Sequence, residues 1–373
     1  MSVAVEHPAR PCPDAPRHRL VGLEQRVRAR FEETGVPSGG TVLVGFSGGG
    51  DSLALGGVLA RIAPIWRVEV VAVHVDHRLR PDSGEEQQRA GELASAIGVP
   101  FRAMRVPVDV RARHPGVGLE EAARRERYRL FALAAGETGA ALIALAHHET
   151  DQVETVLLHL LRGSGLDGVL GMGERTTVAV PWWGEEPAGD SIPLGLWRPF
   201  IFESKATVRA YAANLRLAPV VDPSNEDRTF RRNAVRHEVL PVLERVSQGS
   251  VAAIARFGRL VADDAVALDQ IGWEAYRRCL VGGALSRAGL GGEPRVAIAR
   301  RIVRLWVRER TGGSSPPADR VEAILKLVGG RDAGRRVEIG QHLIVRAAGD
   351  VLVIESMGER AAAAVVEKGL EGR

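Results

Sequence analysis

The chain has 373 residues, of which 45% are hydrophobic and 26% charged, and its formal net charge is +4. This length predicts two domains, or three, and the composition is typical of a globular protein with a buried core. No apolar run reaches the roughly 18 to 20 residues of a membrane span, and residues 1–20 lack the apolar segment of a secretory signal, so a transmembrane or secreted protein is not expected.

The first half of the chain predicts an α/β fold. Residues 1–38 are interpreted as a partly disordered leader. Strands are predicted at 41–46, 68–75, 100–108 and 141–146, alternating with helices at 53–62, 85–97, 119–138 and 151–161. This alternation is typical of a doubly wound parallel sheet. In such a sheet the ligand lies beyond the carboxyl ends of the strands, so residues just after each strand should converge on one site.

The second half of the chain is predicted to be mainly helical. Loops with short strands are expected at 163–195, a polar segment at 219–241, helices at 243–278, 295–308 and 318–328, and a linker at 282–294. Residues 335–355 predict a terminal β-hairpin that turns at Gly349–Asp350. The expected organisation is therefore a leader (1–38), an α/β catalytic domain (39–241) and a smaller C-terminal domain (242–373).

The strongest chemical signal lies between the first predicted strand and helix, and its sequence is Ser47-Gly48-Gly49-Gly50-Asp51-Ser52. Glycines let backbone N–H groups approach an anion, the serine hydroxyls donate, and a helix N-terminus adds positive potential. Asp51 offers a carboxylate that can hold Mg²⁺ on bound phosphates. The pattern is neither a Walker A motif nor the dinucleotide G-x-G-x-x-G. An ordinary glycine-rich turn is the alternative, which the position of the motif disfavours.

Two further motifs are expected beside this loop. His74-Val-Asp76-His77 follows the second strand, although His74 can equally be a strand residue satisfied by the backbone. Arg124 and Arg127 share one face of a helix, where a solvated charged face is the usual explanation.

Polar side chains also follow the fourth strand. His147 and Asp151 lie four residues apart at a helix start, as do His148 and Gln152. A zinc protease would need His-Glu-x-x-His, so catalytic zinc is not expected. Asp151 and Gln152 suit a hard magnesium ion or a polar substrate better.

The polar segment carries the last motif, Asp222-Pro-Ser-Asn225 followed by Arg231-Arg232-Asn233-Ala-Val-Arg236. A basic helix start can grip phosphates or a carboxylate through paired arginine contacts. An N-capped interdomain helix with a solvated face is the alternative. The mild basicity of the chain is compatible with a polyanionic partner but does not require one.

Ser47 to Ser52 resembles the PP-loop of the N-type ATP pyrophosphatases, which have an adenine nucleotide α-hydrolase-like fold. All five motifs occur in the order typical of the tRNA(Ile)-lysidine synthetase family, with Val235 in place of isoleucine. Arg335 to Gly340 and the closing hairpin are similar to the smaller C-terminal tRNA-binding region of that family. Longer members carry a further C-terminal domain, which is not expected in this chain.

The resemblance implies that ATP adenylates the wobble cytidine of the isoleucine tRNA with a CAU anticodon, and that free L-lysine then displaces AMP. It implies ATP and Mg²⁺ as cofactors, a cytoplasmic location and a possible homodimer. The implied catalytic residues are Asp51, His147 and Asp151, with Asp51 also as the magnesium ligand. The implied ATP site comprises Ser47, Gly48, Gly49, Gly50, Asp51, Ser52, His74 and Asp76. The implied tRNA and lysine contacts are Arg124, Arg127, Asp222, Asn225, Arg232, Asn233 and Arg236. A base removed from its stack needs a flat platform, for which Trp182, Trp183, Trp197 and Phe200 are candidates, although packing roles are the simpler explanation for each.

Three other functions remain as alternatives. A PP-loop tRNA thiolase would need more thiols than Cys12 and Cys279, which lie far apart and in no CxxC pair. The same scarcity favours a reducing cytoplasm. A small-molecule amide-forming synthetase would leave the arginine-rich 222–241 segment unexplained. A nucleotide-binding RNA chaperone would not need Asp51 in the loop.

Overall fold

The computed structural model describes residues 21–78, 83–106, 109–163, 165–181, 192–221, 227–311, 315–329, 335–340 and 342–356. The chain divides into two compact units, one of residues 1–158 with 171–257 and the other of residues 159–170 with 258–373. The predicted boundary between residues 241 and 242 lies upstream of this division, which falls within α11 (Ser250–Cys279). None of the described helices combines the length and the apolar character that crossing a membrane requires.

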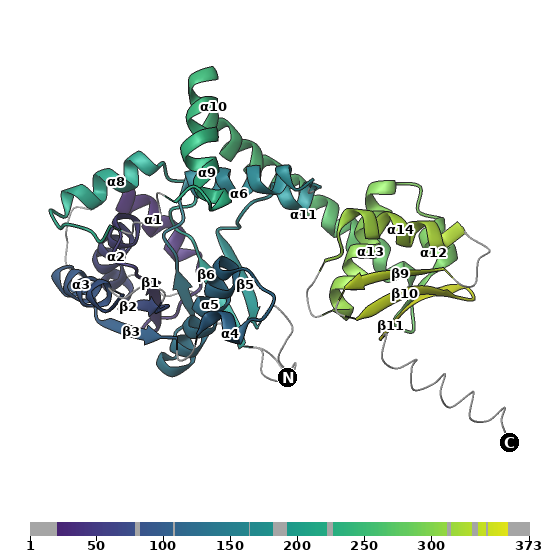
Figure 1. Cartoon of the computed structure of the whole chain (residues 1–373), viewed down its shortest axis with the longest axis horizontal. Coiled ribbons are helices and arrows are strands. Elements are labelled where there is room, and N and C mark those ends of the chain that lie inside the picture. The colour runs from purple at the N-terminus through teal and green to yellow at the C-terminus, as the bar shows by residue number, and fades with distance from the viewer. Residues whose placement is uncertain are drawn as a thin grey trace. The chain divides into compact units, whose positions relative to one another are not determined.

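The first unit contains a six-stranded sheet in the order β3-β2-β1-β4-β6-β5 (Figure 1). Its strands are β1 (Thr41–Gly45), β2 (Glu69–Asp76), β3 (Phe101–Arg105), β4 (Leu142–Ala144), β5 (Arg175–Val180) and β6 (Ile192–Trp197). All neighbouring pairs are parallel except the edge pair of β5 and β6. The predicted parallel sheet is therefore confirmed, with one antiparallel edge strand added from the segment expected to contain only short strands.

Helices cover both faces of this sheet because side chains alternate along each strand. Val42 and Val44 of β1 pack with four helices on one face, whereas Leu43 packs with Tyr128 and Phe131 on the other. The first face carries α1 (Gly22–Glu32), α2 (Gly50–Ile62), α3 (Ser83–Ala96) and α8 (Lys205–Asn214), and the second carries α5 (Leu119–Thr138), next to the short α4 (Val110–Arg113). The doubly wound arrangement predicted from the strand–helix alternation is thus present.

The interpretation of residues 1–38 as a leader is wrong for the part that forms α1. Leu23, Val27 and Phe31 recur every four residues and are at most 4% exposed, so one face of this helix belongs to the core. Residues 1–20 lie outside the described part of the chain.

The polar segment after α8 ends in a nearly continuous helical stretch. It comprises α9 (Arg231–Ala234), a π-helical turn (Val235–Val239), and α10 (Leu240–Val246), which precedes α11. Val235 and Leu240 pack against Val153 of α6 (Glu149–Leu161), which brings this stretch beside the start of α6. Pro241 lies in the first turn of α10, where proline is tolerated because an N–H there has no partner within that helix.

The second unit contains a five-stranded sheet in the order β7-β8-β11-β10-β9. Its elements are the short α7 (Leu166–Val169), β7 (Leu280–Val281), β8 (Ala284–Ser286), α12 (Arg287–Gly291), α13 (Val296–Arg310), α14 (Ala318–Gly329), β9 (Arg336–Gly340), β10 (Leu343–Ala348) and β11 (Val351–Ser356). The turn at Gly349–Asp350 is confirmed, but the expected hairpin is part of a larger antiparallel sheet. The linker predicted at 282–294 is wrong, because β8 and α12 occupy it and Leu285 and Leu290 are buried.

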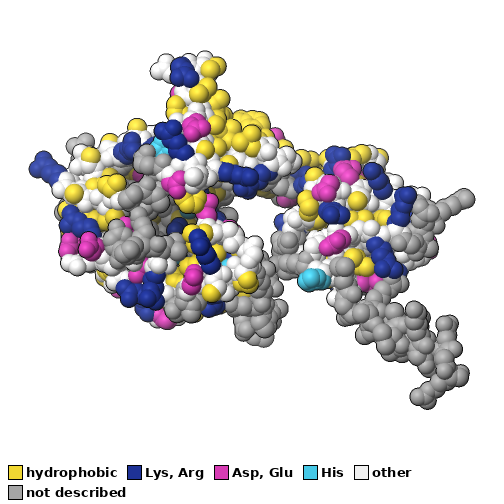
Figure 2. All heavy atoms as spheres, viewed as in Figure 1, with side chains coloured by type: hydrophobic (Ala, Val, Ile, Leu, Met, Phe, Trp, Pro, Cys, Tyr) yellow, Lys and Arg dark blue, Asp and Glu magenta, His cyan; other side chains and the backbone are white. Residues whose placement is uncertain are grey.

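Basic and acidic side chains occur side by side over the face shown in Figure 2, rather than as one large basic patch. Apolar side chains are also exposed there on α10, where Val242 and Val246 are 43% and 80% exposed. Neither sign of charge therefore dominates the described part of this face.

Candidate active site

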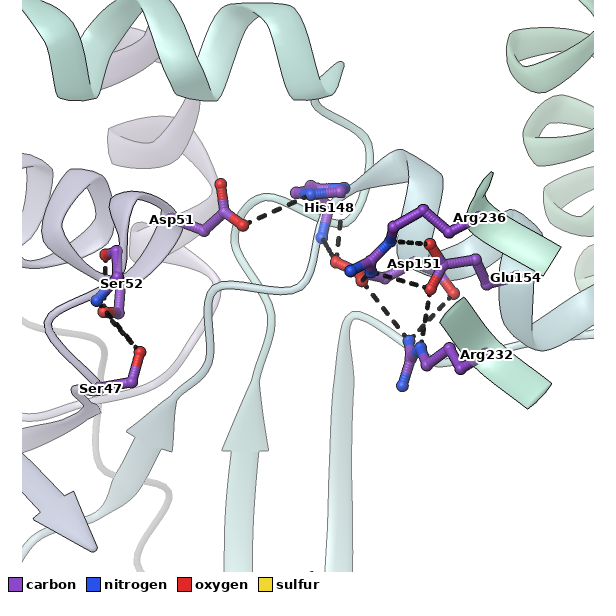
Figure 3. Close-up of polar contacts among 9 residues, drawn as sticks. Ser47, Asp51, Ser52, His148, Asp151, Glu154, Arg232 and Arg236 are labelled. Carbon is purple, nitrogen blue, oxygen red and sulfur yellow. Dashed lines mark hydrogen bonds and ion pairs between the residues drawn. The ribbon is translucent and has the colours of Figure 1, made fainter. Parts of the chain in front are cut away.

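The phosphate loop, residues 47–52, follows β1 and runs into the first turn of α2 (Figure 3). The Ser47 and Ser52 hydroxyls lie 3.2 Å apart, and the Ser52 hydroxyl donates to the Gly49 carbonyl at 3.0 Å. These contacts fix the loop, while the first N–H groups of α2 have no partner within the helix and can face an anion. A side chain at Gly50 would meet no atom within 4 Å, so space is open beside the helix start.

Gly48 is the one position in the loop that requires glycine by conformation. Its φ is +80°, and a Cβ there would stand 2.8 Å from a side-chain carbon of Val220. Its carbonyl accepts a hydrogen bond from the Val220 N–H at 2.9 Å. The loop is therefore supported by Val220, which lies just before the polar motif at 222–236.

Asp51 is the exposed carboxylate of the phosphate loop, with 43% of its side chain accessible. The imidazole of His148 lies beside it, with Nε2 3.7 Å from an Asp51 carboxylate oxygen. Mg²⁺ on a nucleotide takes one or two protein carboxylates and completes its shell with phosphates and water. An open carboxylate at a phosphate-binding helix start fits that requirement. In the described residues, no three His, Cys, Asp or Glu side chains gather into a metal site, so Asp51 would act as a single protein ligand.

The end of β2 lies next to the loop, as the strand order requires. His74 Nδ1 lies 3.0 Å from the Phe46 carbonyl, immediately before Ser47, and burial lowers the pKa of this imidazole. The Asp76 carboxylate is 3% exposed and is already hydrogen-bonded, to the Arg78 N–H at 2.8 Å and to Arg105 Nε at 3.0 Å. The His74 side chain thus contacts the backbone carbonyl of Phe46 at the start of the loop. The Asp76 carboxylate stabilises the turn after β2.

The start of α6 carries the residues that join the loop to the rest of the site. His148, only 1% exposed, stands between Asp51 and Asp151, with its Nδ1 3.4 Å from an Asp151 carboxylate oxygen (Figure 3). The same oxygen accepts the His148 backbone N–H at 2.9 Å. Burial by itself raises the pKa of Asp151, but the neighbouring His148, Arg232 and His147 outweigh it, and the net pKa is lowered. Asp151 is therefore ionised at neutral pH.

His147, predicted as catalytic, has a different environment from His148. Burial and the charges of Arg198, Arg232 and Arg124 lower its pKa to about 3, against the opposing effect of Asp151, so the ring is neutral at pH 7. Its Nδ1 is buried and has no hydrogen-bond partner among the described residues. A neutral imidazole with a spare nitrogen can bind a polar substrate group.

The carboxylate–arginine cluster consists of Asp151, Glu154, Arg232 and Arg236. Glu154 is fully buried and accepts from Arg232 Nε at 2.8 Å and from Arg236 Nε at 2.6 Å. Arg236 also reaches Asp151 at 3.2 Å, and Arg232 lies 3.5 Å from the same oxygen. The two predicted substrate arginines are thus tied to α6 by ion pairs, with 29% and 21% of their side chains still accessible. The basic segment therefore matches neither expectation: its arginines are not wholly available to bind phosphates, and they do not form a wholly solvated helix face.

The other predicted residues of the polar segment are placed only in part. Asn233 is 8% exposed and donates to the Asp227 carbonyl at 2.8 Å, so its amide shapes the turn before α9. Asp222 and Asn225 lie outside the described residues.

Arg124 and Arg127 are exposed on α5, as the helical spacing predicted. Arg124 stacks on Tyr128 at 5.1 Å from the ring centroid, and Arg127 Nε lies 3.4 Å from His77 Nε2. Burial and Arg127 together lower the pKa of His77 to about 4.

The aromatic candidates for a base platform are corrected where they are described. Trp197 and Phe200 are fully buried in the core, so neither can stack on an extruded base. Trp182 and Trp183 lie outside the described residues.

Sequence reasoning did not assign roles to His148, Glu154 and Lys205. Glu154 follows Asp151 by three residues, a helical spacing that could have placed both on one face. His148 could not be separated from His147 by spacing alone. Burial lowers the pKa of Lys205, at the start of α8, and Asp51 and Asp151 are among the charges acting on it. No local pattern links Lys205 to either aspartate.

Comparison with known proteins identifies the family of this chain. A family model described as "PP-loop domain" matches residues 22–243, and one described as "TilS substrate binding domain" matches residues 285–352. A tRNA(Ile)-lysidine synthase from Salinispora arenicola is 38% identical over 86% of this chain and 93% of its own length. One from Thermobifida fusca is 36% identical over 79% and 85%, and one from Geobacter sulfurreducens is 33% identical over 86% and 66%. Among solved structures, a U34-tRNA thiolase from Methanococcus maripaludis has a similar fold, with a TM-score of 0.51 at 16% identity over 64% of this chain and 78% of its own.

Proposed function

This chain belongs to the tRNA(Ile)-lysidine synthase family of PP-loop enzymes, and on that premise we propose that it ligates free L-lysine to C2 of the wobble cytidine in a CAU-anticodon isoleucine tRNA. The observation that carries the proposal is the placement of His148 between Asp51 of the phosphate loop and Asp151 of the carboxylate–arginine cluster. A loop suited to ATP and a cluster suited to an amino acid thus meet at one histidine.

In the first step, the cytosine O2 attacks the α-phosphorus of ATP and diphosphate leaves, which forms an adenylated base. The N–H groups at the start of α2 and the hydroxyls of the phosphate loop bind the phosphates as negative charge develops on them. Mg²⁺ held by Asp51 would neutralise part of that charge. The chain contributes mainly positioning and electrostatic stabilisation in this step.

In the second step, the lysine ε-amine attacks C2 of the base and AMP leaves. The ionised Asp151 can hold an amino group, and the accessible edges of Arg232 and Arg236 can pair with a carboxylate. His147 is neutral and offers a free nitrogen beside Asp151. Because the pKa of both groups is lowered, each binds the amine more readily than it removes a proton from it, so the proton that the amine loses passes to water.

The remaining assignments extend the proposal to the rest of the site. Arg124 and Arg127 offer exposed guanidinium groups for the tRNA, and Asp222 and Asn225 stay predictions from the motif alone. A homodimer and a cytoplasmic location also stay predictions. The thiolase and amide-synthetase alternatives are not favoured, because the relatives at 33–38% identity are tRNA(Ile)-lysidine synthases and the likeness to a thiolase concerns the fold.

The test is incorporation of labelled lysine into CAU-anticodon isoleucine tRNA with ATP and Mg²⁺, with elongator methionine tRNA as the control. We expect incorporation into the isoleucine tRNA alone. Release of diphosphate that depends on the tRNA, without lysine incorporation, would keep the adenylating loop and reject lysine as the nucleophile.

A further inference from the structure

Helix α1 is fastened to the first unit by two buried carboxylates. Glu203, 6% exposed, accepts from Arg26 at 3.0 Å (Nε) and 2.7 Å (Nη2), and it also pairs with Arg30. Near the other end of the helix, Glu24, 2% exposed, accepts from the Tyr211 hydroxyl at 2.8 Å and from Arg61 at 2.6 Å. Each attachment is a buried carboxylate that accepts hydrogen bonds, but the two carboxylates belong to residues with different neighbours.

The attachment at Glu203 continues into the candidate active site. The Glu203 carbonyl accepts the backbone N–H of Glu149 at 3.0 Å. Glu149 is the first residue of α6 and follows His148 directly, so this hydrogen bond holds the turn that presents His148 and Asp151. The partners of Glu24 are instead the Val21 N–H just before α1, Arg61 of α2 and the Tyr211 hydroxyl of α8.

The acidic and buried surroundings of Glu203 explain why it pairs with two arginines. Burial raises the pKa of Glu149, and the nearby carboxylates of Glu203 and Glu244 raise it further. Burial alone would also raise the pKa of Glu203, but hydrogen bonds from Arg26 and Arg30 lower it on balance. Arg26 and Arg30 thus compensate an ionised Glu203 that would otherwise stand uncompensated beside the start of α6.

We propose that Arg26, Arg30 and Glu203 form a positioning clamp that holds His148 and Asp151 in register with Asp51. The inference rests on the proposed function, because register between the loop and the cluster matters only if both act on one substrate. The clamp touches no reacting group, and it acts through the Glu203 carbonyl and the Glu149 N–H. Small displacements of reacting groups are costly, since a shift of about 1 Å can lower a rate by roughly 100-fold.

The experiment compares Glu203→Gln with Glu24→Gln in the full-length protein. Both substitutions remove one buried carboxylate that fastens α1, so both should lower the melting temperature. We expect only Glu203→Gln to lower kcat/KM for lysine, by about tenfold, while KM for ATP changes by less than about twofold. Hydrogen exchange should also quicken at the Glu149 amide in Glu203→Gln and stay unchanged in Glu24→Gln.

Equal kinetic effects of the two variants, measured well below both melting temperatures, would overturn the clamp and leave a purely structural fastening. If Glu203→Gln does not fold, Arg26→Gln and Arg61→Gln provide a milder pair, since these side chains are 50% and 42% exposed. The same two outcomes apply to that pair. Absence of lysine incorporation by the unsubstituted protein would reject the proposed function instead, whereas the exchange rate at Glu149 still decides whether Glu203 holds the turn.

Discussion

The phosphate loop and the carboxylate–arginine cluster are neighbours in the structure but are built in opposite ways. The loop is six consecutive residues, and its carboxylate, Asp51, is 43% exposed and lies 3.7 Å from His148 Nε2. The cluster joins α6 to a helix about 80 residues later, and its charges already neutralise one another around the fully buried Glu154. A substitution of Asp51 should therefore change chemistry alone, whereas one in the cluster should change both stability and chemistry.

The largest effect on stability is expected at the centre of the cluster. Glu154→Gln leaves two guanidinium groups facing a neutral amide, and removal of one partner from a buried ion pair costs about 3–5 kcal/mol. Urea unfolding should show this loss. Glu121→Gln is the matched control, because Glu121 is 45% exposed and pairs with Arg125 at 3.3 Å, and a surface pair contributes about 0–1 kcal/mol. A similar loss in both variants would contradict the difference expected between a buried and an exposed ion pair.

The largest effect on chemistry alone is expected in the loop. Asp51→Asn should lower tRNA-dependent diphosphate release by roughly 100- to 1,000-fold, as removal of a group that stabilises transition-state charge does. The free energy of unfolding should stay within about 0.5 kcal/mol, because the side chain is exposed. Binding of tRNA, measured by filter retention, should be largely unchanged. Retained turnover would remove Asp51 from the metal-binding role.

An intermediate effect on both properties is expected at Arg236. Arg236→Ala leaves Glu154 paired with Arg232, so the loss of stability should be about 1–3 kcal/mol, the cost of one unsatisfied buried hydrogen-bonding group. Lysine incorporation or tRNA binding should weaken as well. Arg228→Ala is the control, since Arg228 is 63% exposed and lies 3.8 Å from Glu238. Unchanged kinetics with full-length tRNA would assign Arg236 a structural role only.

The smallest effect concerns a third arrangement, the half-buried His77, whose Nε2 lies 3.4 Å from Arg127 Nε. The pKa of His77 is about 4 in the fold and 6.5 in the unfolded chain, so the unfolded chain binds the proton more readily. Stability from this residue is therefore complete above about pH 6.5 and falls as the pH drops towards 4. Between pH 7 and pH 5, His77→Gln should lose less stability than the unsubstituted protein, by a difference on the order of 1 kcal/mol. Parallel stability curves for the two proteins would show that His77 does not titrate this way.

Local patterns were sufficient wherever one segment contains the whole signal. The helix predicted at 119–138 matches α5 at both ends, since Gly118 precedes it and Gly139 ends it in a left-handed conformation. The phosphate loop was equally clear, because its glycines, hydroxyls and carboxylate are adjacent in the chain. Its placement at the end of β1 then followed from the strand–helix alternation.

Predictions failed where a segment depends on distant partners. The Pro- and Arg-bearing start of the chain predicts a leader over residues 1–38, whereas three residues of α1 become core only against the sheet. The segment at 282–294 was interpreted as a linker because β8 is only three residues long and is stabilised by pairing with β11, far along the chain. Short strands gain their hydrogen bonds from other segments, so their own sequence carries little signal.

The sequence by itself determined the fold class, the phosphate loop and the membership of Asp151, Arg232 and Arg236 in polar motifs. It did not determine which of two adjacent histidines faces Asp51, nor that Arg232 and Arg236 neutralise Glu154. Those relations depend on the direction of side chains at the start of α6 and on the docking of α9 against it. Only tertiary structure decides them, because the interacting charges lie about 80 residues apart and no local periodicity records their distance.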